Sequence, residues 1–117
     1  MAEPDGIVEE LCLLLSEWGV YQLDDTERAN RAMDRCNDIA RRLNQLGQLV
    51  PTCRVLMNHE TPAVAEYAAS FMLAHDPVSA EAVLTRIARM PGNIGLNATM
   101  TLWVWRRGTL KLPPGLE

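Results

Sequence analysis

Apolar residues recur at steps of three and four along most of the chain, which is the spacing of one face of an α-helix. Gly47 follows the clearest of these runs, and glycine tolerates the left-handed backbone that often ends a helix. No stretch alternates apolar and polar residues over four or more positions between turn signals, as a strand would. The pattern therefore predicts an all-α protein. The clearest run is Ala32, Cys36, Ile39, Leu43 and Leu46.

The same spacing predicts about six helices. Asp5 is the expected N-cap of the first helix, and Asp24 with Glu27 has capping-box spacing at the start of the second. Trp103 and Trp105 lie about 200° apart around a helix, so we expect one of them to be exposed. The other five predicted helices are 7–22, 51–58, 62–74, 77–90 and 94–107, and 51–58 is a two-turn element with Pro51 in its first turn.

Two short polar links, Thr61-Pro62 and Asp76-Pro77, have the same form. Each places a side chain that can cap a helix directly before a proline. Proline suits the first helical position because its missing N–H has no partner there in any case. These prolines therefore begin helices and do not break them. In the helix that follows Pro62, Glu66 and Ser70 are expected to face away from the apolar side.

Short links between amphipathic helices favour antiparallel helix pairs, and stacked pairs can bury apolar faces that a single pair leaves open. The predicted fold is a HEAT/armadillo-like stack of antiparallel helix pairs, a short α-solenoid. A chain of 117 residues suits one domain, 1–117, with tails at 1–5 and 109–117. Because the end pairs of such a stack expose apolar faces, a homodimer is an open alternative.

Charge is unevenly distributed along the chain, which carries a net charge of −4. Residues 1–27 hold eight acids and no base, whereas residues 28–54 hold six arginines and two acids. We expect the first two helices to pack side by side with their charges facing each other. The alternative is a basic docking surface on the second helix for an acidic partner.

No apolar run approaches the roughly 20 residues that cross a bilayer, and the acidic start differs from a basic secretory signal. We therefore expect a cytoplasmic protein with no membrane partner. Cys12, Cys36 and Cys53 have no paired spacing and are expected to act as small hydrophobic residues. Lys111 is the only lysine among eleven basic residues, a bias that suggests a bacterial source.

Three segments together resemble a known family: "VLMNHETPAVAEYAASFML", "NRAMDRCNDIARRL" and "MTLWVWRRGTLK". The first resembles the turn of a HEAT-type repeat, and the other two look like the bacterial HEAT-like family called domain of unknown function 2019. The resemblance covers most of residues 7–112. It implies an α-solenoid fragment and assigns no catalytic residue.

Candidate chemistry is sparse. Asp34 and Asp38 lie one helical turn apart and could hold a divalent ion, but neighbouring arginines make ion pairs the favoured interpretation. His59 and His75 fall at helix ends, and the sequence offers no catalytic constellation around either one. The arginines of the second helix could bind nucleic acid. The chain as a whole is acidic, however, whereas domains that bind phosphate backbones are usually basic. No catalytic residue, cofactor or metal site is predicted.

The expected function is that of a non-enzymatic protein-interaction module or adaptor, one version being an immunity-type protein that neutralises a toxin. A metal-dependent or small-molecule enzyme using Asp34 and Asp38 is the alternative from another class. In stacked pairs the second helices tend to line the concave side, which here means the second, fourth and sixth. Trp103 could instead pack against Leu110 or Leu112 of the tail. The predicted partner-binding residues, all taken to face outward, are Arg31, Asp34, Asp38, Glu66, Tyr67 and Trp103.

Overall fold

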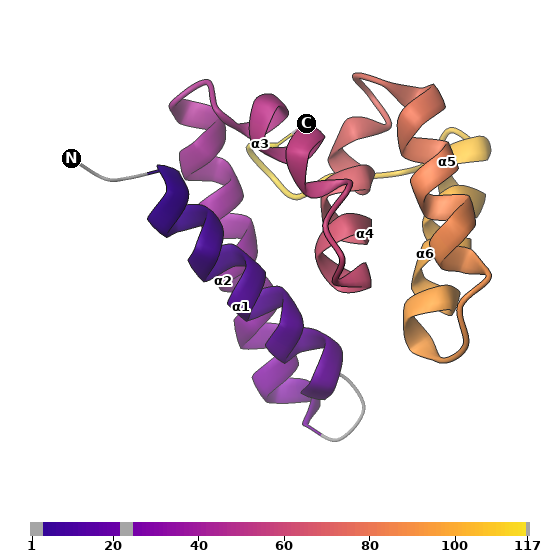
Figure 1. Cartoon of the computed structure of the whole chain (residues 1–117), viewed down its shortest axis with the longest axis horizontal. Coiled ribbons are helices and arrows are strands. Elements are labelled where there is room, and N and C mark those ends of the chain that lie inside the picture. Colours follow the sequence, from indigo (N-terminus) through magenta and orange to yellow (C-terminus); the bar gives the residue numbers. More distant parts are fainter. Residues whose placement is uncertain (1–3, 22–24, 117) are drawn as a thin grey trace.

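The computed structural model describes residues 4–21 and 25–116, which contain six α-helices and no strand (Figure 1). This confirms the all-α prediction over the described residues. The short helix begins two residues before its predicted start and keeps Pro51 in its first turn. The helices are α1 (Pro4–Tyr21), α2 (Thr26–Gln45), α3 (Leu49–Leu56), α4 (Pro62–Met72), α5 (Pro77–Ala88) and α6 (Asn93–Arg106).

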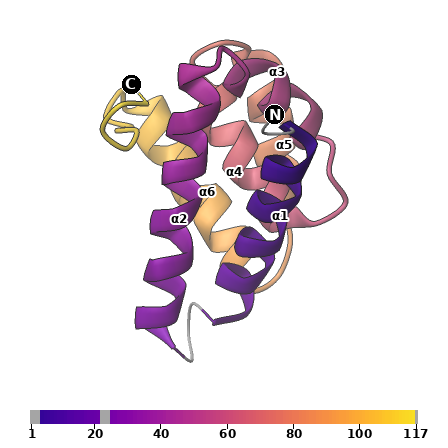
Figure 2. The same ribbon diagram turned by 90° about the vertical axis from the view of Figure 1, so that its left-hand side faces the viewer.

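The helices pack as hairpins stacked side by side. α1 packs along α2, α3 along α4 and α5 along α6, and α4 also contacts α1, α5 and α6. Figure 1 shows the long α1–α2 hairpin on one side of α4 and the α5–α6 hairpin on the other, and Figure 2 looks along the stack with α1 and α2 in front. Each hairpin covers apolar surface of its neighbour, so one continuous core runs through the stack. None of the described helices is long and apolar enough to cross a membrane.

The predicted apolar stripe of α2 lies in the core except at its last residue. Leu46 was expected to close the α2 stripe, but it is 51% exposed. The reason is that α2 ends at Gln45, and Leu46 occupies the C-cap before Gly47, whose φ of 70° lets the chain turn away. The largest fully buried side chains are those of Leu11, Leu15, Leu43, Met72, Leu73, Leu84, Ile87, Val64 and Cys36.

α4 is buried on nearly every side, with eight of its eleven residues buried. Its alanines allow neighbouring helices to approach closely, and α1, α3, α5 and α6 all pack on it. Glu66 and Ser70, which we expected to face solvent, are therefore half-buried. The prediction was wrong because the polar side of this helix also faces other helices.

The proline links begin α4 and α5 as predicted, although only one of them has a side-chain cap. The Asp76 carboxylate accepts a hydrogen bond from the Ser79 N–H at 3.3 Å and pairs with Arg54 at 3.0 Å. Thr61 occupies the N-cap position of α4 with no side-chain hydrogen bond to the helix. Its own N–H instead donates to His59 Nδ1 at 3.0 Å.

The cap of α2 lies one residue later than the sequence indicated. Asp25 is the N-cap, and its side chain accepts a hydrogen bond from the Arg28 N–H at 3.0 Å. The predicted capping box of Asp24 and Glu27 is thus replaced by an Asp25 cap, and Asp24 itself lies outside the described residues. Asp5, expected to be the N-cap of the first helix, lies within α1, which begins at Pro4, so that prediction was wrong.

The acidic α1 and the arginine-rich α2 pair their charges across the hairpin, which confirms the favoured interpretation of the charge pattern. Arg28 Nε lies 2.9 Å from Glu17 Oε1, and Arg35 pairs with Glu10. These side chains are solvent-exposed in part, so the pairs contribute little to stability. The main effect of these pairs is to select which faces of α1 and α2 meet, and their effect on stability is smaller.

The segment after α6 returns across the stack and packs on it. Gly108 ends the helix with a φ of 73°, and Leu110 and Leu112 lie against the core. Further on, Arg41 Nε donates to the Pro114 carbonyl oxygen at 2.6 Å, and Leu116 is 5% exposed. The C-terminal segment is therefore held against α2 by a hydrogen bond and by apolar packing.

Candidate functional site

The three candidate residues on α2 lie on its exposed surface. Arg31 pairs with Glu27 at 3.4 Å and Asp38 with Arg41 at 2.9 Å, while Asp34 is exposed. The described residues include no group of three side chains that could hold a metal ion. The geometry brings none of these three residues to the groove described below.

Tyr67 is not an outward-facing residue, so that expectation was wrong. Its side chain is 9% exposed, and its ring packs edge-on against Phe71 with 5.0 Å between ring centroids. Its hydroxyl donates to Asn37 Oδ1 at 2.8 Å. Burial raises the pKa of Tyr67 well above its ordinary value, so the phenol stays neutral. The ring is covered because α4 is the central helix.

Trp103 is the exposed member of the tryptophan pair, as the helical angle predicted that one would be. It is 55% exposed, and the Arg107 guanidinium lies 4.4 Å from the centroid of its ring. The alternative, in which the tail covers Trp103, does not hold, because the tail packs toward α2 and the core. Trp105 is half-buried against the core.

Trp103 belongs to a row of exposed apolar side chains on α6. Leu96 is 55% exposed and Met100 is 54% exposed; Met100 follows Leu96 by four residues, and Trp103 follows Met100 by three. We call these three residues the α6 stripe. Large apolar side chains that lie singly on a surface are ordinary, but a row along one helix is typical of a contact surface.

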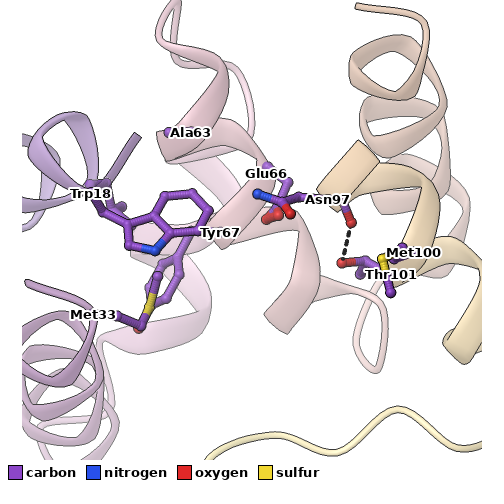
Figure 3. Close-up of a pocket in the computed structure, with 9 residues that line it drawn as sticks. Trp18, Met33, Ala63, Glu66, Tyr67, Asn97, Met100 and Thr101 are labelled. Carbon is purple, nitrogen blue, oxygen red and sulfur yellow. Dashed lines mark hydrogen bonds between the residues drawn. The ribbon is translucent and has the colours of Figure 1, made fainter. Parts of the chain in front are cut away.

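A groove with a volume of 290 Å³ opens between α6, α4 and the α1–α2 hairpin. Its lining combines aromatic, thioether and small polar side chains from all four helices (Figure 3). The second helices of all three hairpins thus meet at one surface, joined by α1. Met100 is shared with the α6 stripe, so the two features adjoin. The lining residues are Leu15, Trp18, Met33, Ala63, Glu66, Tyr67, Asn97, Met100 and Thr101.

Glu66 is the one carboxylate among the described lining residues. In Figure 3 its side chain lies between Trp18 and Met33 on one side of the view and α6 on the other. Burial raises the pKa of Glu66 to about 7, and a hydrogen bond from Ser70 Oγ, 3.5 Å from Oε2, opposes the rise. Near neutral pH this carboxyl is therefore partly protonated.

Sequence reasoning named Glu66 but missed its surroundings. The spacing of apolar residues gives no sign that Trp18, Asn97 and Met100 line one groove with Glu66. The alanine-rich sequence around Glu66 was the available signal, because a helix of small residues is one that neighbours can surround.

Nucleophilic chemistry finds little support in the described residues. Burial raises the pKa of the Cys36 and Cys53 thiols to about 12, so both are protonated at neutral pH and lack the thiolate that attacks substrates. The His59 ring uses Nδ1 to accept the Thr61 N–H. His75 lies exposed at the link between α4 and α5.

Comparison of the chain with protein-family models, with curated proteins and with solved structures yields no match. The fold and the site define a small all-α protein of stacked helix hairpins with a surface groove and an adjoining apolar stripe. The resemblance to a HEAT-like family stays a prediction.

Proposed function

We propose that this chain is a non-enzymatic protein-interaction module and that the α6 stripe is the centre of its partner-binding surface. The observation that carries the proposal is the row of Leu96, Met100 and Trp103, each more than half exposed on one helix. A protein partner that covered this row would remove three large apolar side chains from water at once. Burial of apolar surface is the main driving force of association.

The residue types around Trp103 support a protein partner. Tryptophan and arginine are the side chains most often found at the energetic centres of interfaces. Trp103 stacks with Arg107, and a second hollow of 320 Å³ lies beside it between α5 and α6. Thr85, Arg89 and Arg106 are among the residues that line this hollow, which offers hydroxyl and guanidinium donors around an apolar floor.

The test compares capture of cellular proteins by the wild type and by two variants. Trp103→Ala removes the largest side chain of the α6 stripe, and Val55→Ala is the matched control, because Val55 is 71% exposed on α3, away from α6. We expect one protein to be recovered by the wild type and by Val55→Ala and to be lost with Trp103→Ala. Truncation of an interface tryptophan costs about 2 kcal/mol or more, a weakening of roughly 30-fold.

Two results would count against the proposal. One is a purified protein that carries only nucleotide or metal and captures no protein. The other is capture that is equal for the wild type and Trp103→Ala. Thermal unfolding of each variant establishes that the loss of capture does not come from the loss of the fold.

A further inference from the structure

The described residues that line the groove include one carboxyl group, that of Glu66, and no cationic side chain. Among its described lining residues the only other titratable group is Tyr67, whose phenol is neutral. From α1 the groove receives Leu15 and Trp18, from α2 Met33, and from α6 uncharged polar side chains and Met100. A desolvated carboxylate without a cationic partner is unfavourable, so the groove favours a cation brought by a ligand.

The remaining surface of the groove suits the stem of a long basic side chain. Trp18 offers an indole ring, and Tyr67 also lines the groove, with its hydroxyl bonded to Asn37. Aromatic rings attract guanidinium and ammonium groups, and the methylene stems of arginine and lysine pack on apolar surface. A volume of 290 Å³ corresponds to roughly ten water molecules at about 30 Å³ each, which is ample for one such side chain.

We propose that the groove receives an arginine or lysine side chain from the protein partner, with the cationic end at the Glu66 carboxylate and the methylene stem against Trp18 and Met100. This inference rests on the proposed function, because it assigns one residue of the partner that covers the α6 stripe. Met100 belongs to both features, so a single polypeptide segment can contact the stripe and reach into the groove.

Ionisation of Glu66 couples to this binding event. With its pKa raised to about 7 by burial, the carboxyl is mostly neutral at pH 5.5 and mostly ionised at pH 8. Since the cation pairs with the ionised form, affinity follows the ionised fraction. The ratio of the two fractions predicts binding that is about 30-fold weaker at pH 5.5 than at pH 8.

The test uses N-acetyl-arginine amide as the probe and N-acetyl-norleucine amide as a neutral probe with a similar stem. Each probe is titrated into the full chain while the backbone amide signals of Ala63, Asn97 and Thr101 are followed by NMR. Glu66→Gln removes the charge while keeping the side-chain length, and Glu60→Gln alters an exposed carboxylate outside the groove as a control. Thermal unfolding shows that both variants fold.

We expect the arginine probe to shift these three amide signals saturably, with a dissociation constant in the millimolar range that is ordinary for a fragment. The shifts should disappear with Glu66→Gln, persist with Glu60→Gln and weaken as the pH falls to 5.5. Equal binding of the neutral probe, equal binding to Glu66→Gln, or no saturable shift would each overturn the inference. The probes bind without the protein partner, so a negative result here overturns only the inference about the groove. The proposed function is tested separately, by the capture experiment with Trp103→Ala.

Discussion

Replacing Glu66 with glutamine should make the protein more stable at alkaline pH, and the size of the effect follows from the pKa. Burial raises this pKa from 4.5 to about 7 in the folded chain, so the folded state binds the proton more tightly than the unfolded state. The stability that the proton contributes is complete below pH 4.5 and is lost as the pH rises through 7. At 1.36 kcal/mol per pH unit, the full loss is about 3 kcal/mol.

Urea unfolding followed by circular dichroism at pH 5, 6, 7 and 8 measures this loss. The wild type should lose about 2.5 kcal/mol of unfolding free energy relative to Glu66→Gln between pH 5 and pH 8, because part of the loss already lies below pH 5. Taking the difference between the two proteins removes the titration of groups that they share. Glu60→Gln, at an exposed position, should instead run parallel to the wild type.

Parallel curves for the wild type and Glu66→Gln across this range would refute the reasoning. They would mean that the carboxyl is as well solvated in the folded chain as in the unfolded one. The groove would then be a wide, water-filled depression at Glu66, and the electrostatic part of the inferred contact with a basic side chain would lose its basis.

Three further substitutions test the fold. Asp25→Ala should lower the unfolding free energy by about 1 kcal/mol, while Asp25→Asn should restore most of it, because either polar side chain can cap α2. Gly95→Ala should lower the melting temperature clearly, since the added Cβ would lie 1.9 Å from the Met90 carbonyl oxygen, a backbone atom that cannot rotate away. Tyr67→Phe should cost about 1 kcal/mol in urea unfolding by leaving Asn37 Oδ1 without its donor.

The helices could be predicted from sequence because their signals are local. The steps of three and four residues mark α2 clearly, and the links at Pro62 and Pro77 fix the starts of α4 and α5 to the residue. Where two local signals compete, as at the N-cap of α2, the predicted position was one residue away from the observed one. Asp24 and Asp25 are adjacent and chemically identical, and only the backbone geometry selects Asp25 as the cap of α2.

The candidate site could be predicted only in part, because burial on α4 depends on helices distant in sequence. A helical wheel separates Phe71 from Glu66 but says nothing about whether a second layer covers the polar side. The structure covers it with α1 and α6, which turns Glu66 into a groove residue and buries Tyr67. Trp103 was easier to predict, since the angle between it and Trp105 forces one ring outward whatever the neighbours are.

The position of Glu66 is hard to explain by folding alone. Its desolvation costs about 3 kcal/mol at alkaline pH, against a total stability of about 5–15 kcal/mol for a domain of this kind. A neutral side chain of similar size would fill the same space, because the hydrogen bond from Ser70 to the carboxylate, at 3.5 Å, contributes little. Groups whose ionisation is strongly perturbed in a concave site concentrate where proteins bind ligands or perform chemistry. If Glu66→Gln both stabilises the protein and abolishes binding of the basic probe, Glu66 is a binding residue. A residue required for packing would instead destabilise the protein when it is replaced.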